Sequence, residues 1–387
     1  MRGSCELRAL YRDPAAAGVP WLLDTEVPQV QAALRAAARR TAGDACDLPA
    51  LVADLPDLLV LLRARHFGLA TGVVAADGLD GWAEAWRDRL SAEQPSTWGA
   101  ALGTAIHDLR WLVGDRHLRA AGEDRHRLRA VDPRRHEPVL GDHPGAGGAG
   151  GEPVSESVTD GVLAVRIRSF AHAGAGDRAL ARWRDAHHRH FGYDRMIVDL
   201  RGNGGGGDRY ARDWVAGHVP EPVDFVPGRS WRLAERPLIW NQLVQVEAVH
   251  GPAAIPDYLR RLCPEPRPGA ALTIEAEQWR VAAGPDPWRG RMLVLTDRGT
   301  ASAGEGVAWL LRLAFGARLA GGRSLGAVSY GDIVPYLLPR SGLQVWLATR
   351  WDGFPEVELV GFPLDVELDP RAPLTEVAAD FDRIYGT

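Results

Sequence analysis

Residues 292–305 read Met292-Leu-Val-Leu-Thr-Asp-Arg-Gly-Thr-Ala-Ser-Ala-Gly-Glu305, and an apolar pattern continues to Phe315. The first five residues are mostly apolar, which is typical of a strand that is buried on both faces. After the turn, apolar residues recur at helical spacing, at Ala303, Val307, Leu310, Leu311 and Ala314. The stretch therefore predicts a strand, a turn and a helix that packs back against the sheet.

Ser302 lies at the junction between this turn and the helix. Unpaired backbone N–H groups and the positive end of the helix dipole would face an oxyanion formed there. Ser302 is therefore a candidate nucleophile. The alternative is an ordinary N-cap serine, which is the commonest role of a serine before a helix. This stretch alone does not separate the two interpretations.

The composition narrows the function classes. The chain has 387 residues, enough for two domains, and its formal net charge of −5 gives no sign of nucleic-acid or anionic-membrane binding. Its three cysteines are too few and too scattered for a disulfide framework or a metal site. The amino terminus is charged where a signal peptide is apolar, and no aliphatic run approaches the length of a membrane span. We therefore expect a cytoplasmic protein.

Residues 1–120 predict a helical module. The expected helices cover residues 27–40, residues 55–66 with Asp54 as cap, residues 81–90, and a longer stretch from Ser96 to residue 113. His117 follows the last of them. Residues 121–160 are rich in proline, histidine and glycine, so we expect a linker there. Residues 161–387 form the expected α/β domain.

A glycine-rich loop follows the buried-strand pattern of residues 196–200. It reads Arg201-Gly-Asn-Gly-Gly-Gly-Gly-Asp208 and would let the backbone approach a substrate closely. The spacing is not that of a dinucleotide fingerprint, and no lysine follows as in a P-loop. We interpret it as an oxyanion-binding loop rather than a simple tight turn.

Two motifs together resemble the carboxyl-terminal processing (tail-specific) serine peptidases, a family that includes tricorn protease and the retinoid-binding-protein modules. They are Asp199-Leu-Arg-Gly-Asn-Gly-Gly-Gly206 and, about a hundred residues later, Leu295-Thr-Asp-Arg-Gly-Thr-Ala-Ser-Ala-Gly-Glu305. The resemblance covers most of the chain and implies an α/β fold with a crotonase-like, Clp-protease-like core. It also implies that Ser302 is the nucleophile, with oxyanion donors in the backbone of Ala303 and of the glycine loop near Gly204 and Gly205.

The chain departs from the tail-specific branch of this family in its base. That branch activates its serine with a lysine in a Gly-Lys-Gly-like loop, and Ala327 stands about where that lysine would be. All 45 basic residues of this chain are arginine, which excludes a Ser–Lys dyad. Because a serine hydroxyl is a weak nucleophile without a neighbouring base, another base must serve or the site is inactive.

The tricorn-like branch implies the base that we favour, a histidine at the end of the helical module. Gly114-Asp-Arg-His117 stands at that place, although Arg116 replaces a small residue of the family's pattern. The resemblance further implies an orienting carboxylate from the tail, for which Glu358 is the nearest match and Glu356 the second. The expected roles are nucleophile for Ser302, general base and then acid for His117, and orienting group for Glu358.

A second departure concerns substrate recognition. The tail-specific enzymes carry a peptide-binding PDZ domain between their two modules, whereas only about 45 residues separate His117 from the strand pattern at residue 162. We expect no PDZ domain here. Selectivity would then come from the cleft, the helical module and the Trp-rich insertion at residues 220–290.

A group of histidines raises the question of metal binding. His187-His-Arg-His190 lies near His172 and His218 in the sequence, but no two histidines of the short run have the i, i+4 spacing of a helical zinc site. A solvated helix end is the favoured interpretation. We expect no metal and no cofactor.

The sequence thus predicts a serine hydrolase that cleaves a peptide, or a related amide or ester, through an acyl-enzyme. Two alternatives stay open. One is a non-catalytic ligand-binding protein on the same fold, and the other is a specialised hydrolase or acyltransferase of a peptide-derived metabolite. The expected partner is a peptide or peptide-like substrate, with no nucleic acid and no membrane, and self-association as a homo-oligomer stays open.

Overall fold

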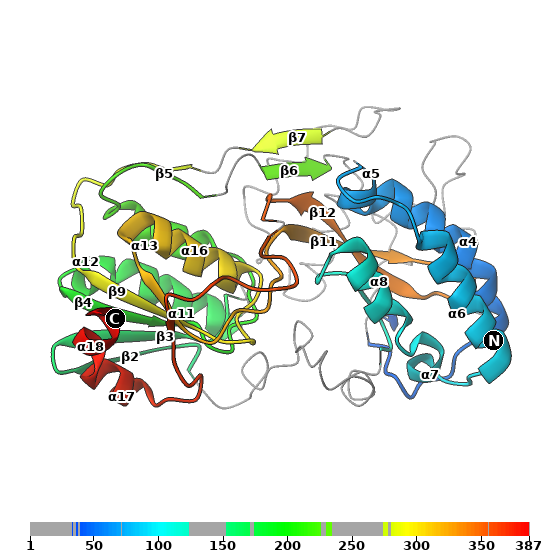
Figure 1. The fold of residues 1–387 in the computed structure, drawn as a ribbon, viewed down its shortest axis with the longest axis horizontal. Coiled ribbons are helices and arrows are strands. Elements are labelled where there is room, and N and C mark those ends of the chain that lie inside the picture. The colour runs from blue at the N-terminus through cyan, green and yellow to red at the C-terminus, as the bar shows by residue number, and fades with distance from the viewer. Residues whose placement is uncertain are drawn as a thin grey trace. The chain divides into compact units, whose positions relative to one another are not determined.

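The computed structural model describes residues 33, 36–37, 39–70, 72–123, 152–170, 174–225, 230–233, 274–277, 280–354 and 356–386. Most of the expected helix at 27–40, the Gly-rich part of the linker and most of the insertion at 220–290 lie outside these residues. The chain divides into two compact units, Met1–His136 with Trp231–Glu277 and Tyr330–Trp351, and Glu137–Ser230 with Gln278–Ser329 and Asp352–Thr387. Each unit is described by itself, with the labels of Figure 1.

The second unit is built on a six-stranded sheet in the order β13-β10-β9-β4-β3-β2. All neighbouring strands are parallel except β2, which is antiparallel to β3. The strands are β2 (Val154–Thr159), β3 (Val162–Ile167), β4 (Arg195–Asp199), β9 (Arg291–Thr296), β10 (Arg318–Gly321) and β13 (Val366–Glu367). The α/β class predicted from the sequence is confirmed.

Helices cover both faces of this sheet (Figure 1). On one face lie α11 (Gly174–Asp185), α13 (Arg209–Ala216) and α16 (Ala303–Phe315), and on the other lie α17 (Leu374–Ala379) and α18 (Phe381–Gly386). Successive side chains of a strand point to opposite faces. Accordingly Val165 of β3 joins the first core and Ala164 the second. Burial on both faces explains why these strands are apolar without alternation.

Three shorter elements complete the described part of the second unit. They are α12 (His187–His190) and the antiparallel pair β5 (Val223–Asp224) and β8 (Arg280–Val281).

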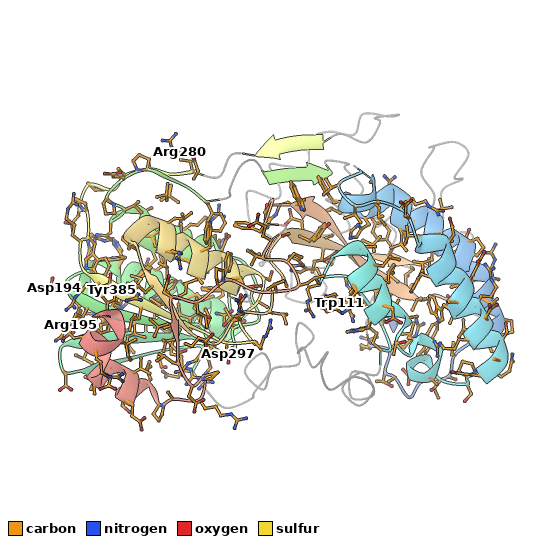
Figure 2. The ribbon with its side chains drawn as sticks, viewed as in Figure 1. Trp111, Asp194, Arg195, Arg280, Asp297 and Tyr385 are labelled. Atoms are coloured by element: carbon orange, nitrogen blue, oxygen red, sulfur yellow. The ribbon has the colours of Figure 1, made fainter. Side chains whose placement is uncertain are left out.

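Three loops leave the carboxyl ends of the parallel strands, which is where open α/β sheets bind their ligands. They are residues 201–207 after β4, residues 297–302 after β9 and residues 322–329 after β10. In Figure 2, Asp297 lies at this end of the sheet, and Asp194 and Arg195 at the start of β4 lie at the opposite end, near Tyr385. The glycine-rich loop and the loop that carries Ser302 therefore lie at the same end of the sheet.

The first unit combines helices with a sheet in the order β1-β12-β6-β7, in which β11 also pairs with β12. Its helices are α4 (Leu48–Arg65), α5 (Phe67–Ala70), α6 (Leu79–Glu93), α7 (Trp98–Leu102) and α8 (Ala105–Val113). Its strands are β1 (Arg119–Ala120), β6 (Ser230–Leu233), β7 (Ile274–Glu277), β11 (Tyr330–Leu337) and β12 (Gln344–Trp351). Trp86 and Trp98 are buried among the leucines of these helices.

The β11–β12 hairpin groups with the amino-terminal helices, whereas the sequence placed it in a domain covering residues 161–387. Strand β1 pairs with β12 through Arg119↔Trp346 and Ala120↔Val345, which lie far apart in the sequence. Apolar side chains of the hairpin, among them Tyr336, join the helical core. The compact units therefore interleave along the chain instead of following one another.

Asp54 does not cap a helix, contrary to the sequence-based expectation. Helix α4 begins at Leu48, and its N-cap Asp47 accepts a hydrogen bond from the Ala50 N–H at 3.1 Å. Asp54 is buried inside α4, and its carboxylate accepts from the backbone N–H and the hydroxyl of Ser341 at 2.7 and 2.6 Å. Asp54 therefore ties the turn of the β11–β12 hairpin to the helix.

Within the described part of the chain, no helix has both the length and the apolar composition that crossing a bilayer requires.

Candidate active site

Ser302 has a backbone conformation that is rare for a residue with a side chain. Its φ is 53° and its ψ is −122°, immediately before α16. An N-cap residue normally has an extended backbone. Strained conformations of this kind cluster at functional sites, because the surrounding structure must hold them. Ser302 therefore stands at the N-cap position and in a capping box with Glu305, but with a backbone conformation that a cap alone does not require.

The buried carboxylate of Glu305 holds Ser302 in place. One of its oxygens accepts from the backbone N–H of Ser302 at 3.1 Å and of Ala327 at 2.8 Å, and the other accepts from Gly326 at 2.8 Å. Burial raises the pKa of Glu305, and hydrogen bonds from Ser324 and these amides offset part of the rise. Glu305 thus joins the start of α16 to the loop at 322–329. The Ser-x-x-Glu capping pattern was the signal for this role, which the sequence analysis did not assign.

Gly205 lies directly beside the nucleophile candidate. Its φ is +98°, and a Cβ at this position would lie 2.8 Å from Ser302 Cβ and 3.0 Å from Ala303 N. Only glycine fits such a close approach. The Gly205 N–H donates to Asn203 Oδ1 at 2.9 Å, so this amide is engaged within the protein. Gly204 and Ala303 are left as the predicted oxyanion donors.

Hydrogen bonds lock the glycine loop to the loop that carries Ser302. Asp297 Oδ1 accepts from the N–H of Gly202 and of Gly299, both at 2.8 Å. The carbonyl of Asn203 accepts from Ala301 N at 2.9 Å, and Thr300 Oγ1 donates to the carbonyl of Leu200 at 2.8 Å. Asp297 and Thr300 belong to the motif around Ser302, so the motif residues build the loop contact.

An arginine anchors the glycine loop from behind. Arg201 pairs with Asp199 through two hydrogen bonds of 2.8 and 2.9 Å, and it also donates to the carbonyls of Pro370 and Ala372 at 3.0 and 2.8 Å. Bidentate pairs of this kind fix geometry as well as adding energy. The Asp-Leu-Arg part of the motif therefore positions the loop and leaves the glycines for close approach.

The position implied for the family's lysine is held by Ala327, which is fully buried. Next to it, the buried carboxylate of Glu358 accepts from the N–H of Val328 at 3.0 Å and of Ser329 at 2.7 Å. The N–H of Leu359 donates back to the carbonyl of Gly326 at 2.8 Å. Glu356, the second candidate, is exposed. Burial and hydrogen bonding thus favour Glu358 of the two carboxylates.

His117 belongs to the first unit and lies on a short segment after α8, which ends at Gly114 with a φ of 61°. Its neighbour Asp115 is buried and accepts from the His117 N–H at 2.7 Å, with its other oxygen 3.0 Å from His66 Nε2. His117 Nδ1 lies 3.8 Å from the same carboxylate. Asp115 and His66 therefore fix the segment that carries His117, a role that the sequence analysis did not assign to them.

Electrostatics keep His117 neutral near pH 7. Burial lowers the pKa of His117 to about 4, the charges of Asp115 and Asp332 raise it, and those of Arg119 and Arg350 lower it. Burial alone would raise the pKa of Asp115, but the hydrogen bond and charge of His66, followed by His117, lower it below its usual value. A neutral imidazole is the form that a general base requires.

The predicted site residues come from both compact units. Ser302, Ala303, Gly204 and Gly205 lie in one loop cluster of the second unit. Glu358 belongs to the same unit, and its carboxylate accepts a hydrogen bond from the 322–329 loop that Glu305 ties to Ser302. His117 is held by its own buried carboxylate in the first unit.

The model of peptidase family S41 matches residues 161–352. A solved structure of a candidate peptidase from Parabacteroides merdae ATCC 43184 has a TM-score of 0.51 at 15% identity, over 85% of this chain and 96% of that one. The photosystem II D1 C-terminal processing protease has a TM-score of 0.43 at 15% identity, over 87% and 97%. No curated protein sequence matches the chain.

Proposed function

The chain belongs to peptidase family S41, and we propose that it is a serine peptidase that acts through Ser302, His117 and Glu358. The observation that carries the proposal is the strained backbone of Ser302, held beside Gly205 and fixed by Glu305. A residue that serves only as a helix cap does not need this conformation. The substrate class is a peptide or a peptide-like amide or ester.

The proposed reaction is acyl transfer in two steps. His117 takes the proton of the Ser302 hydroxyl as its Oγ attacks the scissile carbonyl, and the amides of Ala303 and Gly204 stabilise the oxyanion. His117 then gives the proton to the leaving amine, and an acyl-enzyme remains on Ser302. Water hydrolyses this ester, with His117 again as the base. Glu358 orients the imidazole and stabilises its charged form.

The absence of lysine makes His117 the proposed base. All 45 basic side chains are arginine, which stays protonated in proteins and is a poor general base. The proposal requires the two units to bring His117 to Ser302 in the active state. The role of a base is consistent with the burial of His117 and with the hydrogen bond from its N–H to Asp115.

Fluorophosphonate labelling tests the proposal directly. We expect one covalent adduct per chain, which peptide mapping assigns to Ser302, because the probe reports a serine activated by a base. The matched control is Ser157→Ala, which removes an exposed serine from β2 and should leave labelling unchanged. A chain that folds but takes up no probe would identify a binding protein and overturn the peptidase proposal.

The two tail carboxylates offer a matched pair of variants. We expect Glu358→Gln to reduce kcat/KM by about 10-fold or more, because a neutral amide stabilises the imidazolium less well than a carboxylate. Glu356→Gln removes the same charge from an exposed side chain and should change kcat/KM by less than about 2-fold. Peptide hydrolysis and thermal unfolding would be measured together. Equal effects of the two variants would remove Glu358 from the triad.

A further inference from the structure

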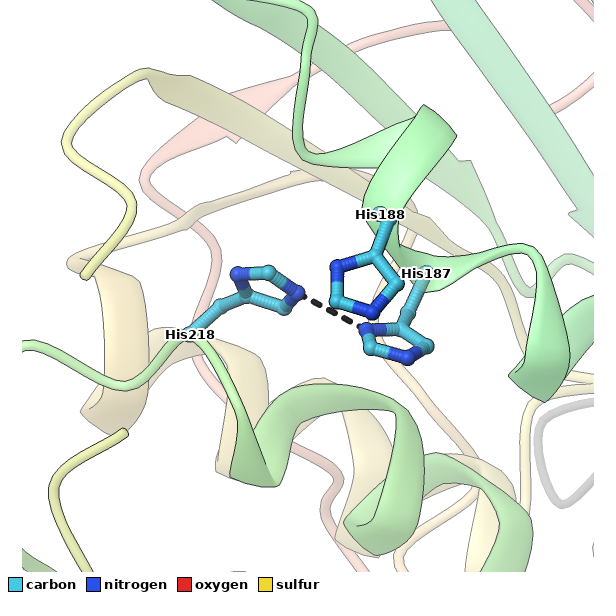
Figure 3. Close-up of side chains that lie close together, drawn as sticks. All are labelled: His187, His188 and His218. Carbon is cyan, nitrogen blue, oxygen red and sulfur yellow. Dashed lines mark hydrogen bonds between the residues drawn. The ribbon is translucent and has the colours of Figure 1, made fainter. Parts of the chain in front are cut away.

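Three histidines of the second unit converge, although the sequence pattern did not predict it. His187 and His188 belong to α12, and His218 follows α13 and Gly217. Each offers one ring nitrogen, and these atoms all lie within 4.8 Å of one another. Figure 3 shows the three rings lying close together, with His187 Nδ1 2.9 Å from His218 Nε2. The third histidine comes from a separate element, so the i, i+4 rule for one helix does not apply.

We propose that His187, His188 and His218 form a binding site for a divalent transition-metal ion of the Zn²⁺ class. Imidazole nitrogen is a preferred ligand of Zn²⁺, Ni²⁺ and Cu²⁺. With metal–nitrogen distances of about 2.0–2.1 Å, two ligands of a tetrahedral site lie roughly 3.3 Å apart. The contact between His187 and His218 is already of that size, and small rotations of the side chains bring the third nitrogen in.

The protonation of His218 is fixed as a metal ligand requires. Its Nδ1 lies 2.9 Å from the backbone carbonyl of Asp286, which can only accept a hydrogen bond, so Nδ1 carries the proton. This leaves the lone pair of Nε2 directed at His187. Metal-binding histidines usually donate their second ring N–H to a carbonyl or carboxylate in this way. On metal binding the ion replaces the proton of His187 Nδ1, which moves to the other nitrogen of that ring.

One side of the proposed metal site is buried in the protein, and the other side is open to solvent. The ring of His218 is buried against Phe191, with centroids 4.1 Å apart, and the N–H of Trp288 donates to the His218 carbonyl at 2.9 Å. His188 is exposed, so an ion can enter from solvent.

The proposed site is separate from Ser302. Phe191 also packs on Phe315, the last residue of α16, at 5.3 Å between ring centroids. Ser302 lies at the other end of this helix, whose 13 residues span roughly 20 Å. A bound ion would therefore join α12 to the segment after α13 without touching the nucleophile. Its role is to clamp the fold.

A Zn²⁺ titration of the metal-free full-length chain, in competition with a chromophoric chelator, tests the proposal. We expect one Zn²⁺ per chain to bind more tightly than any other, and His218→Gln and His188→Gln each to weaken it at least about 10-fold. Zn²⁺ should raise the unfolding temperature of the wild-type chain and have little effect on that of these variants. His188 is exposed, so its variant keeps the test valid if His218→Gln does not fold.

His107→Gln is the matched control, because it removes a histidine of α8 outside the cluster. It should bind Zn²⁺ as the wild type does. The proposal is overturned if the wild type binds Zn²⁺ no more tightly than His188→Gln, or if His107→Gln loses as much affinity. Fluorophosphonate labelling of the same variants should stay at the wild-type level, which separates this proposal from that of the peptidase.

Discussion

Ser302→Ala is expected to lower peptide hydrolysis by roughly 10⁴-fold or more, because the variant has no atom on which the acyl-enzyme can form. The predicted oxyanion amides of Ala303 and Gly204 remain, so a small residual rate over water should persist. The measurement is kcat/KM for the best-cleaved peptide of a library. The variant should stay folded, because Glu305 binds the backbone N–H of residue 302, and loss of the Ser302 side chain from the capping box should lower its unfolding temperature only modestly.

Ser157→Ala serves as the control for this variant, since Ser157 is exposed on β2. It should retain wild-type kcat/KM. Hydrolysis that survives in Ser302→Ala at the wild-type level would contradict the assignment of the nucleophile, whatever the fate of the other residues.

His117→Ala is expected to lower kcat/KM by about 10²- to 10⁴-fold, the usual contribution of a positioned general base. The loss should be largest near neutral pH, where the wild-type imidazole is neutral. Asp115→Asn should cause a smaller loss, because Asp115 holds the His117 segment through its backbone N–H and does not itself take the proton. Wild-type kcat/KM in His117→Ala would contradict the assignment of His117 as the general base.

The pH profile gives an independent check on the same residue. A general base works in its deprotonated form, so activity is present above its pKa and lost below it. Burial lowers the pKa of His117 to about 4. The acid limb of kcat/KM should therefore lie well below pH 6.5, the ordinary histidine pKa. An acid limb near pH 6.5 would indicate that another histidine, or a solvated His117, is the base.

The lowered pKa of His117 also makes the folding stability of the protein depend on pH. The folded state binds a proton at His117 more weakly than the unfolded chain does, so this residue costs stability as the pH falls from about 6.5 towards 4. The pH profile must therefore be accompanied by a folding measurement at each pH. Activity that disappears while the protein is still folded reports the base rather than acid unfolding.

The sequence predicted the sheet of the second unit and the neighbourhood of Ser302 for a clear physical reason. Strands buried on both faces give continuous apolar runs, as at 196–200 and 292–296, and these became β4 and β9. The glycine loop and the serine turn follow neighbouring parallel strands, so they meet at the carboxyl edge of the sheet. A local pattern was enough for both.

Features that depend on distant partners were not predictable. The expected helix from Ser96 to residue 113 is divided into α7 and α8 at Gly103. Arg89 of α6 donates to the carbonyls at the end of α7 and ends that helix. The sequence around Gly103 does not reveal an arginine from another helix. The pairing of β1 with β12 and the contact of His218 with His187 are of the same kind.

The roles of the site residues were likewise predictable where a local motif carried them and not where they depend on distant partners. Ser302, His117 and Glu358 were named from motif positions, and burial now separates Glu358 from the exposed Glu356. Asp115 and His66 were missed, because their value lies in a buried hydrogen bond between residues on separate elements. A polar residue beside a candidate base, as in Asp115-Arg-His117, is the signal that could have drawn attention to Asp115.

In a chain that has no lysine, we propose that the Ser302 hydroxyl depends on His117 for its activation as a nucleophile. The most direct measurement is the rate of fluorophosphonate labelling of Ser302 in the wild-type chain and in His117→Ala, with both proteins shown to be folded. We expect the labelling rate to fall by about 10²-fold or more in the variant. Equal labelling rates in the two proteins would contradict it, because Ser302 would then be activated without His117.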